Sequence, residues 1–237
     1  LGLHHQELGL SWDQPVPEKL WNRVAEYCGN DVDATIEVFK HTYSDYKARL
    51  ILADLSGLPI NASTKQHAES WLFGNDPRPQ DKFIYTDLGE VFEGYKYSYG
   101  KSEYMGEDPS EGGYVYAEPG VYEDVVLLDV ESLHPHSLIA LNYFGPYTPR
   151  FAELVKTRMA IKHKDYATAR NAFNGQLKPY LENEEDAKSL AFALKIIINI
   201  VYGLTSAKWD NKFKHVKNVD NIIAKRGALF MIKLKHE

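Results

Sequence analysis

The sequence predicts an α+β fold in which a long antiparallel helical hairpin follows a short buried strand. The strand signal is the apolar run at residues 124–129, DVVLLD, which ends on an acidic residue. The hairpin signal is a pair of long helical stretches, expected at residues 150–172 and 184–202, with a turn at 175–183 between them. A strand followed by an αα-hairpin is typical of the α+β class.

Helices and loops are expected before that strand. Residues 17–18, Pro-Glu, favour a helix start, and apolar residues follow them at helical spacing. A second helical stretch is expected over residues 31–55 and a third over 63–73, each followed by a glycine that favours a stop. Residues 82–122 are rich in Tyr, Gly and acidic side chains, which predicts loops with short strands.

The hairpin helices carry their own start signals. Thr148 is expected as an N-cap with Pro149 at the first helical position. The acidic residues 184–186 suit the positive N-terminal end of the second helix. The periodic stretch 227–237 predicts a further helix at the end of the chain, and the chain begins at Leu1 without a methionine. We therefore expect both ends to be cuts within a longer protein.

Composition excludes several classes of protein. Cys28 is the single cysteine, so an internal disulfide framework is excluded, and neither a C-x-x-C pair nor an H-E-x-x-H motif indicates zinc. The longest apolar run, 196–201, is too short to span a bilayer, and no signal segment opens the chain. A cytoplasmic protein in a reducing environment, with no membrane partner, is expected.

Charge is divided unevenly along the chain. The 237 residues carry a formal net charge of -6, yet residues 149–237 hold 17 Lys and Arg against 9 Asp and Glu. Residues 1–148 hold 10 against 24. A basic third beside an acidic remainder indicates one lobe that binds a polyanion, and accidental surface charge is an equally good explanation.

Basic residues also recur at helical spacing within the hairpin. Lys195, Asn199 and Tyr202 fall on one stripe of the second helix, and Arg158 and Lys162 share a face of the first. Two such stripes on adjacent helices would clamp a polyphosphate, since Arg binds phosphate as a fork and Lys as a point charge. The alternative is that both stripes are solvated faces.

Asp129 is the candidate for metal chemistry. A carboxylate at the end of an apolar strand, followed by a turn whose backbone N–H groups could face phosphates, is what phosphoryl transfer with Mg²⁺ requires. The alternative is an ordinary aspartate that caps the following turn.

These residues resemble the motifs of family B DNA polymerases, most closely those of tailed-bacteriophage replicative enzymes. Residues 129–139, DVESLHPHSLI, resemble motif A, D-x-x-S-L-Y-P-S-I-I, and residues 195–203, KIIINIVYG, resemble motif B, K-x-x-x-N-S-x-Y-G. Residues 158–162 lie between them, where the family has its basic fingers helix. Residues 27–31, YCGND, resemble the third exonuclease motif, Y-x-x-x-D. The four motifs follow the order of the family.

The resemblance implies two-metal nucleotidyl transfer. Asp129 would be the catalytic residue and would bind both Mg²⁺ ions with the Val130 carbonyl. His134 stands where the family has a tyrosine under the sugar, while His136 and Ile200 replace the usual serines of motifs A and B. The residues implied to bind the incoming dNTP are Ser132, Leu133, His134, Arg158, Lys162, Lys195, Asn199 and Tyr202.

The resemblance also implies two further sites on the chain. Tyr27 and Asp31 would belong to a 3′–5′ exonuclease site, although an ordinary i, i+4 pair on a helix is the alternative. Gly112 and Gly113, together with Gly203, would contact the template strand.

The implied organisation is a fragment of a polymerase. Residues 1–45 would end the exonuclease domain, 46–121 would connect to the palm, 122–147 would carry motif A, 148–205 would form the fingers hairpin and 206–237 would return to the palm. The expected function is addition of deoxynucleotides to a primer by a monomeric parent protein that binds primer–template DNA. Because the second palm aspartate and the first two exonuclease motifs are absent from the sequence, the isolated chain is expected to be inactive. The alternative function is a non-catalytic nucleic-acid-binding module.

Overall fold

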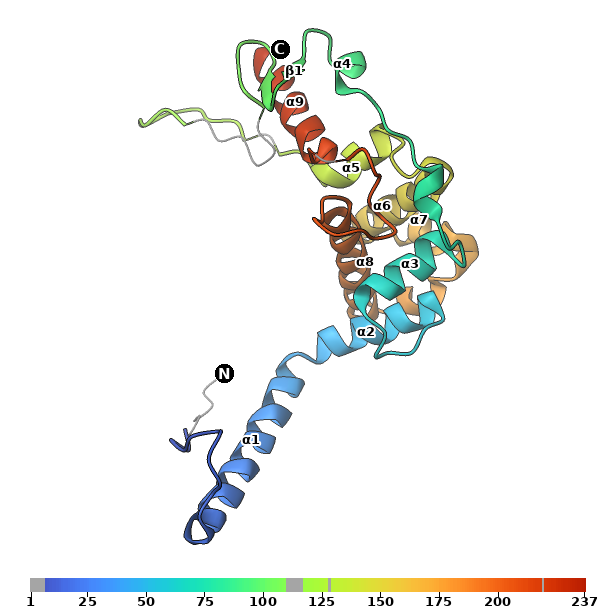
Figure 1. Ribbon diagram of the computed structural model, residues 1–237. Helices are drawn as coiled ribbons and strands as arrows, with labels where there is room; N and C mark the ends of the chain where they lie inside the picture. Colours follow the sequence, from blue (N-terminus) through green and yellow to red (C-terminus); the bar gives the residue numbers. More distant parts are fainter. Residues whose placement is uncertain (1–6, 110–116, 128, 219) are drawn as a thin grey trace.

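The computed structural model describes residues 7–109, 117–127, 129–218 and 220–237. These residues are mostly helical and include one two-stranded antiparallel sheet, so the architecture is mixed α+β (Figure 1). The α-helices are α1 Trp21–His41, α2 Tyr43–Ser56, α3 Thr64–Phe73, α4 Leu88–Val91, α5 Leu133–Ala140, α6 Thr148–Lys162, α7 Tyr166–Asn171, α8 Glu184–Thr205 and α9 Ile222–His236. The strands are β1 Lys96–Ser98 and β2 Lys101–Glu103, and the 3-10 helices are η1 Glu18–Leu20, η2 Pro79–Lys82, η3 Gly145–Tyr147, η4 Ala172–Gly175 and η5 Lys178–Leu181.

Helix α8 lies at the centre of the core and packs against α2, α3 and α6 (Figure 1). Its length and apolar content would suffice to cross a membrane, but half of its apolar window is buried within the protein. Its start follows from local chemistry, since the Asn183 side chain accepts a hydrogen bond from the Asp186 N–H and caps the first turn. The buried residues along it are Ala187, Ser189, Leu190, Ala193, Leu194, Ile197, Ile198, Val201, Leu204 and Thr205.

Helices α6 and α8 are antiparallel, as the sequence predicts for a hairpin. The Lys164 Nζ, just beyond the end of α6, lies 3.6 Å from the Glu184 Oε1 at the start of α8. At the other end, Phe151 of α6 lines a small cavity together with Ile197 and Val201 of α8. The two contacts at opposite ends define the hairpin.

The first hairpin helix is shorter than predicted. It was expected to reach residue 172, but α6 ends at Lys162 and Lys164 has a left-handed backbone with φ of 61°. Asp165 then caps α7 by accepting a hydrogen bond from the Thr168 N–H. The helical period continues through this region, so periodicity alone did not reveal the break. Thr148 was expected as the N-cap, with the helix beginning at Pro149. Instead, Thr148 is the first residue of α6 and Tyr147 is at the N-cap position.

The N-terminal helices differ from the prediction in where they are divided. The expected division near residue 30 is absent, and α1 runs without a break until Thr42, where α2 begins. The stop at Gly57 is confirmed, because its φ of 68° is the left-handed geometry that glycine adopts at low cost. Ser63 and Gln66 form a reciprocal capping box at the start of α3, which confirms that predicted start.

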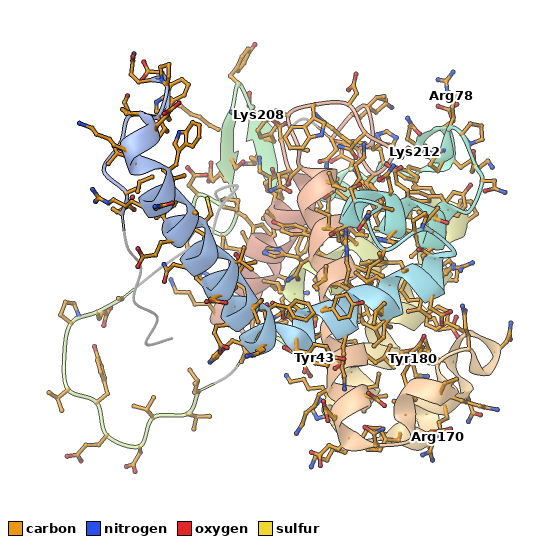
Figure 2. All side chains as sticks on the ribbon, turned by 90° about the horizontal axis from the view of Figure 1, so that it is seen from below. Tyr43, Arg78, Arg170, Tyr180, Lys208 and Lys212 are labelled. Atoms are coloured by element: carbon orange, nitrogen blue, oxygen red, sulfur yellow. The ribbon has the colours of Figure 1, made fainter. Side chains whose placement is uncertain are left out.

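Helix α1 projects from the body of the molecule and has no buried residue (Figure 1). Figure 2 shows its side chains spread around the helix along its length, with the body reached near Tyr43. At that junction the rings of Phe39, Tyr43 and Tyr46 pack on one another, with centroids 5.4–5.9 Å apart. The position of α1 is therefore set at its C-terminal end.

The predicted buried strand at residues 124–129 is wrong for the residues that are described there. Val125, Val126 and Leu127 are 70%, 81% and 89% exposed and belong to no strand. A strand needs a neighbour for its N–H and C=O groups, whereas the described strands β1 and β2 pair with each other. Those strands lie within residues 82–122, where short strands were expected.

Candidate functional site

The loop that precedes α5 lies against both helices of the hairpin. Ser132 has a left-handed backbone with φ of 55°, and its hydroxyl contacts the Met159 sulfur of α6 at 3.8 Å. Leu133 packs on Gly227 of α9, where an added Cβ would lie 3.3 Å from the leucine side chain. The absence of a side chain at Gly227 therefore allows α5 and α9 to approach closely.

His134 reaches the second helix of the hairpin. Its imidazole stacks on the Tyr202 ring of α8, with centroids 4.2 Å apart and an angle of 1° between the planes. Burial lowers the pKa of His134, because the charged imidazolium loses hydration. Its Nδ1 is buried and has no hydrogen-bond partner among the described residues. The imidazole therefore contacts Tyr202 through the face of its ring.

Glu131 makes a contact that sequence reasoning missed. Its Oε1 accepts a hydrogen bond from the Lys162 Nζ at 2.6 Å, and its Oε2 lies 3.3 Å from the His163 Nε2. Lys162, with a smaller contribution from His163, holds the pKa of the Glu131 carboxyl below its usual range. The charges were visible in the sequence, but 31 residues separate Glu131 from Lys162, so no local pattern linked them.

The other predicted phosphate-binding residues lie on the hairpin helices. Lys195 and Asn199 are exposed and Tyr202 is half-buried on one stripe of α8, as the helical spacing predicts. Arg158 is half-buried on α6, one turn before Lys162. The stack and the Glu131 ion pair bring residues 131–134, the end of the loop and the start of α5, to both helices. Three separate segments therefore meet at one place.

The predicted metal ligands lie at the start of this loop. Asp129 is exposed and Val130 is half-buried. In the described part of the chain, no three His, Cys, Asp or Glu residues are grouped so that they could hold a metal ion. Mg²⁺ is commonly bound by one or two carboxylates plus substrate phosphates. Asp129 and the Val130 carbonyl could therefore supply the protein ligands of one such ion. Glu131, the next carboxylate along the chain, is paired with Lys162 instead.

The predicted exonuclease residues lie away from this junction. Tyr27 and Asp31 are both on α1, which projects from the body (Figure 1). A hydrogen bond between their side chains and the nearby Asp31 charge raise the pKa of the Tyr27 hydroxyl. The two residues influence each other within α1, and this helix has no residue buried against the body.

The predicted template contacts are described only in part. Gly112 and Gly113 lie outside the described residues. Gly203 is exposed on α8, and an added Cβ there would have no neighbour within 4 Å. Its place in the helix leaves an open surface beside Tyr202.

No family model, curated protein or solved structure matches this chain. The motif resemblance and the geometry of the junction are therefore the two grounds on which a function is inferred.

Proposed function

We propose that the chain is the palm-and-fingers part of a DNA-directed DNA polymerase, which adds deoxynucleotides to a primer 3′ end. The observation that carries the proposal is the His134–Tyr202 stack, with ring centroids 4.2 Å apart. It joins the motif A-like loop to the motif B-like helix. A nucleotide site built from those two motifs requires such proximity.

The incoming dNTP would lie where residues 131–134, at the start of α5, meet α6 and α8. Arg158 and Lys195 would neutralise its phosphates, Arg as a planar fork and Lys as a mobile point charge. Asn199, one turn beyond Lys195, would donate a further hydrogen bond. The stacked His134 and Tyr202 rings would form the floor under the sugar, which favours a deoxyribose by occupying the space of a 2′-hydroxyl.

Asp129 and the Val130 carbonyl would hold Mg²⁺ together with the triphosphate, and the ion would offset the charge of the phosphates. Two ions need a further carboxylate, and Glu131, the next one along the chain, is paired with Lys162. The isolated chain is therefore proposed to bind nucleotide without turnover. Tyr27 and Asp31 would belong to a proofreading site of the same parent protein.

Binding of dATP to this chain tests the proposal directly. Titration in Mg²⁺ is expected to show saturable binding that Lys195→Met weakens about tenfold, as expected for loss of a charge-assisted contact to phosphate. Lys188→Met is the matched control, because Lys188 is exposed on the same helix and pairs with Glu184. Equal binding by the two variants would contradict the proposed phosphate site.

A second candidate function is supported by the loop that follows α8. Trp209 is 62% exposed beside Lys208, and exposed aromatic rings among basic residues suit single-stranded nucleic acid. Figure 2 places Lys212 near Arg78 and Lys208 apart from both, and the Lys212 Nζ already donates to the Asp76 carbonyl at 3.1 Å. A non-catalytic binding module would bind DNA with the same affinity in two conditions, one with Mg²⁺ and dNTP and the other with EDTA and no dNTP.

A further inference from the structure

A cavity of about 470 Å³ lies beside α9, away from every residue placed in the nucleotide site. Two segments far apart in the sequence line it, at 85–97 and at 220–225. Its volume is within the range of about 300–1,000 Å³ that is usual for small-molecule sites. Its charged lining residues are Asp87, Lys96, Asp220 and Lys225, and its aromatic lining residues are Tyr85, Tyr95 and Tyr97.

Lys225 is a nearly buried cation on the wall of this cavity. It is 5% exposed, and its Nζ lies 4.5 Å from the centroid of the Tyr97 ring. Among the described residues, Lys225 takes part in none of the ion pairs, which are counted to an N–O distance of 4.0 Å. A buried ammonium without an ionic partner is costly, since the ring face replaces only part of its hydration. A ligand that presents acceptor atoms to Lys225 would relieve that cost.

Asp220 supplies an acceptor on the same wall. It is half-buried, directly before the N-cap of α9, and lines the cavity with Lys225. Burial, followed by the charges of Asp87 and then Asp220, raises the pKa of Tyr85. Burial, with a smaller contribution from Asp220, raises the pKa of Tyr95. The cavity therefore offers a carboxylate acceptor from Asp220 and an ammonium donor from Lys225 within one lining.

The tyrosine rings provide flat apolar surface around these two charges. Tyr85 and Tyr97 are 43% and 47% exposed, so each keeps a large part of its ring accessible. Tyr85 is held by the His215 ring behind it, with centroids 5.7 Å apart. A flat heterocycle could stack on such rings, and base–aromatic stacking contributes to binding whichever base is present.

We propose that this cavity binds one unpaired nucleobase of a nucleic-acid strand, and that guanine fits it best. Guanine presents O6 and N7 as acceptors, which Lys225 would contact, and N1–H and the N2 amino group as donors, which Asp220 would accept. Thymine has no amino group for Asp220, and adenine has no carbonyl for Lys225. A tyrosine ring would stack on the base.

The fold indicates a strand as the source of the base. Helix α9 carries Lys225 on the cavity side, while the next residue, Arg226, lies with its Nη1 3.5 Å from the Ser137 Oγ of α5. Gly227 packs on Leu133 at the start of α5. The packing of α5 on α9 therefore connects the cavity with residues 131–134, and a strand that reaches the proposed nucleotide site would pass near both. A free guanine nucleotide is the other source of the same chemistry.

Fluorescence anisotropy with labelled ten-nucleotide strands tests the proposal on the whole chain. A strand of thymidines with one central dG is expected to bind about tenfold more tightly than a strand of thymidines alone. This is the discrimination against a wrong base that one well-formed base contact provides. Lys225→Met and Tyr97→Leu are expected to abolish that difference. Lys233→Met, an exposed lysine two turns further along α9, is the matched control and is expected to retain it.

Several outcomes distinguish the possibilities. Equal binding of both strands, or a preference for dG that persists in Lys225→Met and Tyr97→Leu, overturns the proposal. Both variants are expected to fold, because Lys225→Met removes a buried charge and Tyr97→Leu changes a half-exposed ring. Circular dichroism checks that each variant keeps its helical content. Competition by GMP as effective as that by the dG strand supports the base site and assigns it to a free nucleotide. Because Mg²⁺ and dNTP are omitted, a failure of the proposed polymerase function leaves this result unaffected.

Discussion

The imidazole of His134 lies flat on the phenol ring of Tyr202, with an angle of 1° between planes and centroids 4.2 Å apart. The contact connects the first turn of α5, directly after the loop that ends at Ser132, to the last turns of α8, across 68 positions of sequence. Together with the Glu131–Lys162 ion pair it holds the loop to both hairpin helices. The geometry of the proposed nucleotide site depends on these two contacts.

Loss of the stack is expected to destabilise the fold by about 0.5–1.5 kcal/mol beyond the loss of buried area. The measurement is a double-mutant cycle with His134→Ala, Tyr202→Ala and the double variant, each unfolded in urea. The coupling energy from the cycle isolates the ring contact from the burial of each ring. Additive effects of the two single variants would show that the rings do not interact.

The free energy of unfolding is expected to fall as the pH drops below about 6.5. Burial lowers the pKa of His67, His134 and His215 below the 6.5 of an unperturbed histidine. The unfolded chain therefore binds more protons than the folded chain below that pH, and protonation favours unfolding. Above pH 6.5 this contribution to stability is fully present.

Urea midpoints at pH 7.5 and 5.5 measure that pH dependence. His134→Phe, which keeps a flat ring on Tyr202, is expected to reduce the difference between the two midpoints. His136→Phe is the control, because His136 is exposed two residues away in the same helix. A pH dependence that His134→Phe leaves unchanged would assign it to the other two histidines.

Glu131→Gln is expected to strengthen binding of a triphosphate about threefold, in the range of an exposed ion pair. The substitution removes a carboxylate that repels phosphate and releases Lys162, whose Nζ lies 2.6 Å from Glu131. Titration with dATP at low and high salt measures the change, and screening should reduce it at high salt. Glu185→Gln, which breaks an exposed Glu–Lys pair with Lys47, is expected to leave binding unchanged. Weaker binding by Glu131→Gln would mean that Glu131 holds the loop in its binding conformation.

Tyr143→Phe is expected to lower the free energy of unfolding by roughly 1–3 kcal/mol, the cost of leaving buried donors unpaired. The Tyr143 hydroxyl accepts from the His215 N–H at 2.9 Å and from the Asn218 Nδ2 at 3.3 Å. Burial raises the pKa of this hydroxyl to about 12, so it stays protonated. Tyr99→Phe, at a fully exposed ring, is the control for urea unfolding and is expected to have no effect.

Features that depend on one turn of chain were predictable from the sequence. The capping box of Ser63 and Gln66, the stop at Gly57 and the start of α8 at Glu184 each involve residues within a few positions of one another. The exposed stripe of Lys195 and Asn199 follows from the helical period. Local hydrogen bonds and φ preferences decide these features, and the sequence displays both.

Features that depend on distant neighbours were decided by the tertiary structure. Residues 125–127 have the composition of a buried strand, yet no described strand pairs with them, because burial is a property of the surroundings and not of the segment. The Glu131–Lys162 pair, the His134–Tyr202 stack and the cavity around Lys225 each join residues that are far apart in the chain. The sequence by itself determined the helix starts and stops that rest on local caps, such as those at Gly57, Ser63 and Asn183, and which residue types were available. Packing determined which of those residues meet, because contact between distant segments depends on how every intervening element folds.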